Sequence, residues 1–188
     1  MDMRKTSLTS LALALILALA TTLPAQAEVP GGRFILWNKD RQAVTDNDFR
    51  GKYLLVFFGY TFCPDICPTS LNMVSEAMDI LGDKAEQVVP LFISVDPARD
   101  TVEHLRDYVE HFHPSMVGLT GTQEMIDRVA KSYKVTFVKV REEGAEEDNY
   151  TMDHTASIFL MGPDGKFRVK FLHGISSEDL AKRVAEFM

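Results

Sequence analysis

The sequence has 188 residues, 46% of them hydrophobic, and a formal net charge of -7. An acidic chain without a stripe of lysine and arginine argues against nucleic acid or an anionic membrane surface as partners, and a basic protein surface is a more natural partner. The length suits one domain with a sizeable apolar core, and two domains would be cramped.

The first residues have the three parts of a secretory signal peptide. Two basic residues precede an apolar run at 11–20, and Ala-Gln-Ala ends at Ala27. The run is about half of the roughly 20 residues that a membrane helix needs. We therefore predict a cleavable signal peptide at 1–27, a single domain at 28–188, and a periplasmic or otherwise extracytoplasmic location. A membrane-anchored form that retains the leader is the alternative.

The first elements after the leader are strands and one helix. Residues 33–37 and 42–44 flank a turn-rich segment and predict an N-terminal β-hairpin. The apolar run YLLVFFGY at 53–60 is typical of a strand buried on both faces. Helical spacing of apolar residues then predicts a helix that Pro68 opens and Gly82 ends.

The rest of the chain continues to alternate between strands and helices. Asp100-Thr-Val-Glu103 has the pattern of a helix cap. We expect strands at 87–95, 117–119, 135–140, 155–161 and 167–172, and helices at 100–112, at 122–133 and from 177. The order β-α-β-α-β-β-α predicts a thioredoxin-like α/β fold, with a mixed central sheet covered by helices on both faces and preceded by the hairpin.

The two cysteines, Cys63 and Cys67, lie between the buried strand and the next helix. A disulfide across so short a loop would stabilise the fold little, so the pair favours a chemical role. Free amides and the helix dipole favour thiolate at this place, and thiolate is both a nucleophile and a metal ligand. The cysteine pair is therefore compatible with both redox chemistry and metal binding. Three intervening residues permit a wide sulfur separation around an ion, and soft thiolates select Cu(I) or zinc.

His154 is the candidate for a third ligand. It precedes the strand at 155–161, on a loop that approaches the cysteine turn in a thioredoxin-like fold. Dithiol oxidoreductases of this fold keep a cis proline there, whereas this chain has no proline at 115–162. Asp65 and Asp153 are candidates to orient the ligands or balance their charge.

The remaining histidines and the acidic run have simpler interpretations. Histidines two apart on a helix point to different faces, so we expect a solvated surface rather than a second metal site at 104–113. His173 is expected to be solvated as well. The acidic run at 142–148 predicts a solvated loop, with docking of a basic partner as the alternative.

Three blocks of the sequence resemble the Sco/SenC family of copper chaperones: LVFFGYTFCPDICPT at 55–69, SVDPARDT at 94–101, and DHTA with LMGPDGKF at 153–167. The resemblance implies copper bound by Cys63, Cys67 and His154, as Cu(I) and with Cu(II) as a further candidate. It also implies delivery of copper to the dinuclear copper centre of cytochrome c oxidase.

The expected partners follow from the same resemblance. They are the copper-site subunit of the oxidase and an upstream copper donor or a thiol reductant. We expect no nucleic acid partner, and membrane association only if the leader is retained.

A thiol-disulfide oxidoreductase is the alternative function. It would use Cys63 and Cys67 as a redox disulfide to reduce the copper-ligand cysteines of the oxidase. The three-residue spacing and the missing cis proline count against it, so we expect the protein not to be an enzyme in its main role. A peroxidase is disfavoured because Thr61 lies two residues before Cys63 instead of three.

Overall fold

The computed structural model describes residues 29–188. The predicted signal peptide at 1–27 lies outside the described residues, so its cleavage and the domain boundaries stay predictions. Within residues 29–188, no helix combines the length and the apolar character that crossing a bilayer requires.

A five-stranded mixed sheet forms the centre of the fold, in the order β5-β4-β3-β8-β9. Strands β3, β4 and β5 run parallel to one another, whereas β8 runs antiparallel to β3 and β9 runs antiparallel to β8. Every residue of the two strands at the centre, β3 and β8, is buried, which explains the continuous apolar runs in the sequence. The strand bounds are β3 Tyr53–Gly59, β4 Val88–Ser94, β5 Val117–Leu119, β8 Ser157–Met161 and β9 Phe167–Leu172.

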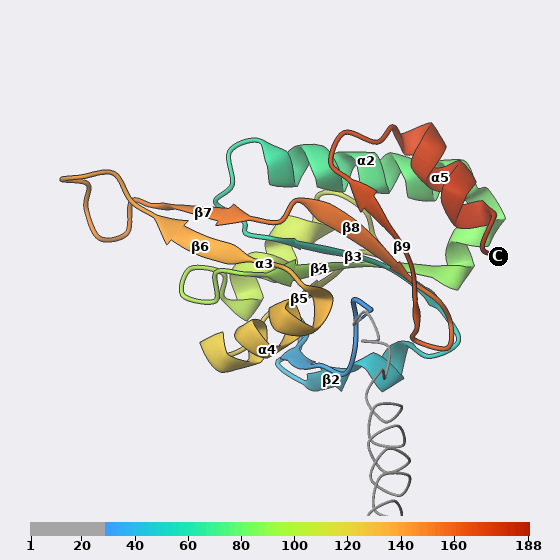
Figure 1. The fold of residues 1–188 in the computed structure, drawn as a ribbon, viewed down its shortest axis with the longest axis horizontal. Coiled ribbons are helices and arrows are strands. Elements are labelled where there is room, and N and C mark those ends of the chain that lie inside the picture. Colours follow the sequence, from blue (N-terminus) through green and yellow to red (C-terminus); the bar gives the residue numbers. More distant parts are fainter. Residues whose placement is uncertain (1–28) are drawn as a thin grey trace, which may run out of the picture.

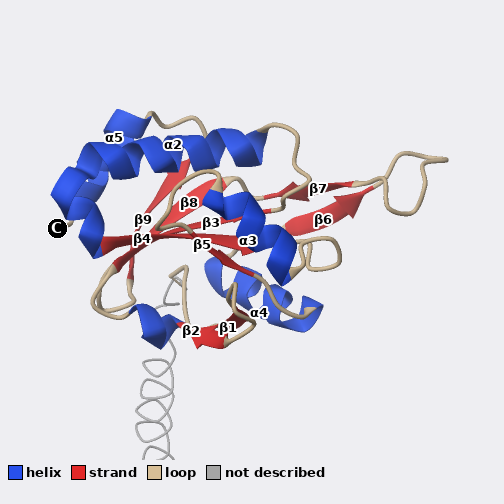
Figure 2. Cartoon of the chain, turned by 180° about the vertical axis from the view of Figure 1, so that it is seen from behind, coloured by secondary structure: helices blue, strands red, loops and turns tan. Residues whose placement is uncertain are grey.

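Helices cover both faces of this sheet (Figures 1 and 2). Neighbouring residues of a strand point to opposite faces. Phe58 contacts Tyr133 of α4, whereas Phe57 stacks on Phe92, which in turn contacts Tyr108 of α3. Helices α2 and α5 pack against each other above the sheet in Figure 1. The helix bounds are α2 Ile66–Leu81, α3 Val102–Glu110, α4 Gln123–Tyr133 and α5 Ser177–Ala185. The mixed sheet with helices on both faces confirms the predicted fold class.

Two small hairpins accompany the sheet. Strands β1 (Ile35–Trp37) and β2 (Ala43–Thr45) pair antiparallel and confirm the predicted N-terminal hairpin. Strands β6 (Phe137–Val140) and β7 (Thr151–His154) form a second hairpin, which projects from the body of the molecule (Figure 1). Short 3-10 segments, η1 (Asp46–Phe49) and η2 (Gly82–Gln87), follow β2 and α2.

Helix α2 begins earlier than predicted. It starts at Ile66 instead of Pro68, so Cys67 lies in its first turn. Proline is tolerated there because the first N–H groups of a helix have no acceptor within it. The helix ends where predicted, at Gly82, whose φ of 54° favours glycine.

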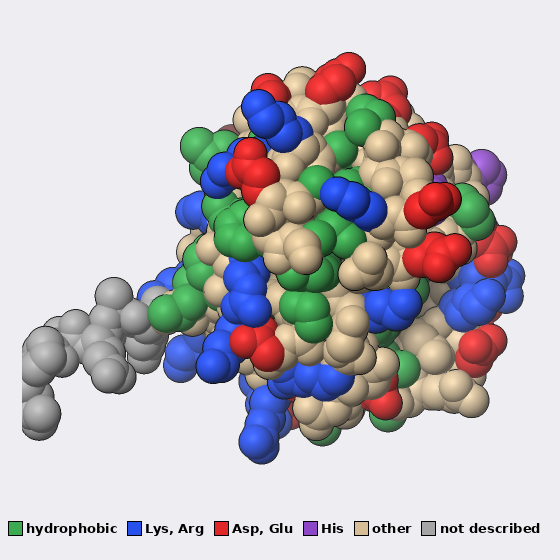
Figure 3. All heavy atoms as spheres, turned by 90° about the vertical axis from the view of Figure 1, so that its right-hand side faces the viewer, with side chains coloured by type: hydrophobic (Ala, Val, Ile, Leu, Met, Phe, Trp, Pro, Cys, Tyr) green, Lys and Arg blue, Asp and Glu red, His purple; other side chains and the backbone are tan. Residues whose placement is uncertain are grey.

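The prediction missed strand β7. The acidic residues at 142–148 lie at the exposed tip of the second hairpin instead of in a loop that leads directly into β8. Because strand β7 is half exposed, its sequence lacks the continuous apolar run of a buried strand. Its pairing with β6 stabilises its extended conformation. On the face that Figure 3 shows, basic side chains gather toward the lower left, and acidic side chains are more frequent toward the top and right.

Candidate metal site

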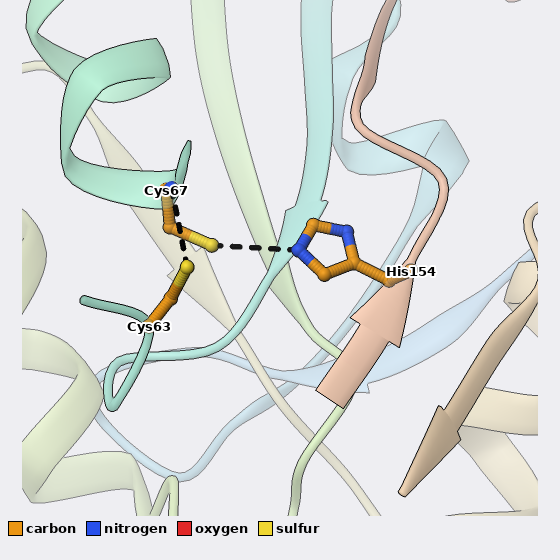
Figure 4. A group of neighbouring side chains, drawn as sticks. All are labelled: Cys63, Cys67 and His154. Carbon is orange, nitrogen blue, oxygen red and sulfur yellow. Dashed lines mark hydrogen bonds between the residues drawn. The ribbon is translucent and has the colours of Figure 1, made fainter. Parts of the chain in front are cut away.

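Three side chains from distant segments meet beyond the carboxyl end of β3 (Figure 4). Cys63 lies in the loop after this strand, Cys67 in the first turn of α2, and His154 at the end of β7. One donor atom of each lies within 4.8 Å of the other two. Metal–sulfur and metal–nitrogen bonds of about 2.3 and 2.0 Å would separate the donors of a trigonal site by about 4 Å. The three predicted residues are therefore close enough to hold one ion together.

The two cysteines are free thiols, and the first turn of α2 helps to set the position of the Sγ of Cys63. The backbone N–H of Cys67 donates to the Sγ of Cys63 over 3.4 Å, which uses one of the free amides of the first turn. The N–H of Cys63 donates to the carbonyl oxygen of Tyr60 over 3.3 Å. Cys67 is buried and Cys63 is half-buried, so Cys63 is the more accessible sulfur.

The protonation of Cys67 differs from the expectation that its place at a helix start favours thiolate. Burial raises the pKa of the Cys67 thiol, and the neighbouring Cys63 adds to this, while the backbone of Tyr60 opposes it. The thiol of Cys67 therefore carries its proton at neutral pH, and a metal ion that binds there must displace it.

His154 presents one ring nitrogen to the cysteines. Its Nε2 lies 3.5 Å from the Sγ of Cys67, and its Nδ1 lies 3.4 Å from the carbonyl oxygen of Thr155. The carbonyl can only accept, so Nδ1 carries the proton and Nε2 keeps a lone pair for a metal. Burial lowers the pKa of His154, against the backbone of Thr155 and the charge of Asp153. The neutral imidazole that binds metal is thus the favoured form.

Gly59, the last residue of β3, makes room for the buried thiol. A Cβ at this position would lie 2.8 Å from the Sγ of Cys67 and 2.7 Å from a ring carbon of Phe92. No larger residue fits without moving one of them. The sequence analysis did not single out Gly59, although a glycine inside a buried strand signals that another group approaches closely.

Asp100 has a different role from the one that its sequence pattern predicts. It was expected to cap α3, but the hydroxyl of Thr101 caps this helix by accepting from the N–H of His104 over 3.2 Å. The fully buried carboxylate of Asp100 accepts from the hydroxyls of Thr61 and Ser94 over 2.6 Å each, and from the N–H of Thr61 over 3.2 Å. Asp100 therefore fixes the turn two residues before Cys63.

The two carboxylates that were expected to support the ligands are exposed. Asp65 precedes α2, and its Oδ1 lies 3.5 Å from the hydroxyl of Thr69. Asp153 acts on His154 through its charge. That either residue orients a ligand stays a prediction.

Three of the other histidines have partners outside the group of Cys63, Cys67 and His154. His104 stacks on Phe62, His113 lies 3.8 Å from Asp79, and the Nδ1 of His173 lies 3.3 Å from the hydroxyl of Ser70. Within residues 29–188, the group of Cys63, Cys67 and His154 is the one set of three such donors.

The fold and the site together define a class: a thioredoxin-like protein in which two thiols and an imidazole form a set of soft metal ligands. The sequence model of the SCO1/SenC family matches residues 23–188. The chain therefore belongs to the SCO1/SenC family.

Individual relatives agree with this assignment. "Protein sco1" of Schizosaccharomyces pombe is 42% identical over 158 residues, which is 84% of this chain and 60% of the relative. ScoI of Bradyrhizobium japonicum, solved with copper bound, is 42% identical with a TM-score of 0.77, and the match covers 85% of this chain and 100% of that one. Because the chain spans only 60% of the length of the fission yeast protein, the activity of that longer protein is carried over only as a proposal.

A more distant similar structure is described with a redox property of its own. BsSco, described as a member of the Sco family of cytochrome c oxidase assembly proteins with a disulfide switch, is 25% identical with a TM-score of 0.60. The match covers 85% of this chain and 93% of that one.

Proposed function

We propose that the protein binds one copper ion through Cys63, Cys67 and His154. The observation that carries the proposal is the convergence of these three donors within 4.8 Å at a buried strand end. Two thiolates and one imidazole suit Cu(I), and the imidazole is also a ligand for Cu(II). The copper-bound structure of the Bradyrhizobium japonicum relative supports the choice of metal.

We further propose that copper is cargo, delivered to the dinuclear copper site of cytochrome c oxidase. Three ligands leave copper with a low coordination number, so a cysteine of an incoming protein can add to the ion before one of the chain's own ligands leaves. The half-buried Cys63 lies on the accessible side of the site. The description of BsSco supports the oxidase as client, and an extracytoplasmic location would place the protein beside it.

The test is to mix copper-loaded protein with the reduced, metal-free copper domain of the oxidase and to measure the copper content of each after separation. We expect transfer to the oxidase domain. Protein loaded with zinc is the control for unspecific ligand exchange. If copper stays on the loaded protein under all ratios, delivery is excluded while copper binding stands.

A thiol-disulfide exchange role is a second proposal, supported by the disulfide switch of BsSco and by the close approach of the two cysteines. In this reaction Cys63 and Cys67 form a disulfide, and the two electrons and two protons convert a disulfide of the oxidase copper domain into two thiols. Counting free thiols in the oxidase domain after mixing tests it. The half-buried Cys63 is the more accessible of the two cysteines, so it would be the one that attacks the disulfide of the oxidase domain.

A further inference from the structure

The hairpin that carries His154 is not part of the central sheet. Among the described residues, β6 and β7 pair with each other as a separate two-stranded sheet. His154 lies three residues before β8, and its distance from the two cysteines also depends on contacts that hold the hairpin against the cysteine loop. The side chain of Arg99, in the connection between β4 and α3, makes such contacts with both.

On the hairpin side, Arg99 binds the start of the strand that leads to His154. Its Nη1 donates to the carbonyl oxygens of Tyr150 and Asp148 over 3.0 and 3.3 Å, and its guanidinium carbon lies 3.5 Å from the centre of the Tyr150 ring. The hydroxyl of Tyr150 donates to one oxygen of Asp96 over 2.8 Å, and the other oxygen accepts from the Nε of Arg99 over 2.6 Å. Arg99, Asp96 and Tyr150 thus close a ring of contacts four residues before His154.

On the cysteine side, the same guanidinium group contacts two aromatic rings of the loop. It lies 4.7 Å from the ring centre of Phe62, the residue before Cys63, and 5.7 Å from that of Tyr60. The ring of Tyr60 in turn meets the ring of His154 edge to face at 6.0 Å. One side chain therefore touches both of the segments that form the site.

The contacts require arginine and not only a positive charge. A planar guanidinium can stack on aromatic rings while its edge donates several hydrogen bonds, which an ammonium group cannot do. The side chain of Arg99 is 13% exposed, and its Nη2 is buried with no hydrogen-bond partner among residues 29–188. A buried donor without a partner is unfavourable, so the remaining contacts must hold the group in place.

We propose that Arg99 is a positioning residue that sets the distance between His154 and the cysteine loop and so determines the affinity of the metal site. The inference rests on the proposed copper function for its effect on metal binding. Its structural part, the attachment of the hairpin to the cysteine loop, does not depend on a metal.

The first test compares copper binding in Arg99→Lys with that in Arg50→Lys. Lysine keeps the charge but not the stacking, so we expect a 10- to 100-fold loss of copper affinity, the range found for residues that orient metal ligands, and an altered thiolate-to-Cu(II) absorption band. Arg50 serves as a control because it also pairs with a buried aspartate, Asp46, over 2.7 Å, but its side chain is 39% exposed and its contacts are with η1 and the turn before β9. Arg50→Lys should keep the wild-type affinity and spectrum.

The second test uses metal-free protein. We expect amide hydrogen exchange at 151–154 to be about tenfold faster in Arg99→Lys than in the wild type, with unchanged exchange inside α4. Tyr150→Phe, which removes only the hydroxyl bond to Asp96, should have a smaller effect in the same direction and serves if Arg99→Lys does not fold.

The outcomes distinguish a failure of the positioning role of Arg99 from a failure of the proposed copper function. Wild-type copper affinity, spectrum and exchange in Arg99→Lys would overturn the positioning role, and so would equal losses in Arg50→Lys. A wild-type protein that binds no copper would overturn the proposed function, while the exchange comparison would still decide the role of Arg99.

Discussion

The Sγ of Cys67 lies 3.5 Å from the Nε2 of His154, although the two residues are 87 positions apart in the chain. This contact joins the first turn of α2 to the end of β7. It places the buried thiol and an imidazole lone pair around the same point, with the Sγ of Cys63 beside them. The site is thus assembled by the tertiary structure, and each of its ligands can be tested separately.

Replacing His154 by alanine should weaken copper binding by more than about 100-fold, because loss of a direct ligand exceeds the 10- to 100-fold effect of supporting residues. Cu(II) binding should be affected more than Cu(I) binding, since two thiolates alone still suit Cu(I). Competition titrations with each oxidation state measure both. His173→Ala is the matched control, because His173 is exposed and bonded to Ser70. Undiminished Cu(II) affinity in His154→Ala would remove this residue from the ligand set.

Copper affinity should rise with pH. The raised pKa of Cys67 means that its thiol is protonated at neutral pH, so each Cu(I) that binds releases at least one proton. Release of one proton makes the affinity about tenfold higher per pH unit. Competition titrations between pH 6.5 and 8 give the slope, and Cys67→Ser should reduce it. An affinity independent of pH would contradict a protonated thiol.

The free energy of unfolding of the metal-free protein should depend on pH through the protonation of His154. Burial lowers its pKa in the folded state below the ordinary value of 6.5. The unfolded chain therefore binds the proton more readily, so this contribution to stability is present above pH 6.5 and is lost as the pH falls toward the lowered pKa. Denaturant unfolding across this window should show a steeper decline for the wild type than for His154→Gln. Parallel curves would show that the imidazole is not perturbed by folding.

Much of the fold was predictable because it rests on local signals. Continuous apolar runs predicted the buried strands, and Gly82 predicted the end of α2. Strand β7 was not predictable, because its pairing with β6 decides its conformation and its own residues have no apolar periodicity.

The three candidate ligands could be selected from the sequence and lie together in the structure, whereas their surroundings could not be predicted. The cysteine spacing and the family blocks were sufficient to select Cys63, Cys67 and His154. The raised pKa of Cys67 was not foreseen, because burial depends on residues distant in sequence such as Phe92. The role of Asp100 was missed for the same reason, since its partner Thr61 lies 39 positions away.

Gly59→Ala should damage the metal site without replacing any of the three candidate ligands. The added Cβ would overlap the Sγ of Cys67 at 2.8 Å, so the sulfur must move away from the position that it shares with His154. Overpacking of this kind costs about 1–3 kcal/mol of unfolding free energy. Gly118→Ala is a matched control, because its Cβ would meet Leu105 at 2.9 Å in the same sheet, and its nearest neighbours are Leu105 and Val109 rather than a thiol. We expect both variants to lose stability in denaturant unfolding and only Gly59→Ala to show an altered Cu(II) absorption spectrum. If the two variants bind copper equally well, the absence of a side chain at residue 59 serves packing alone.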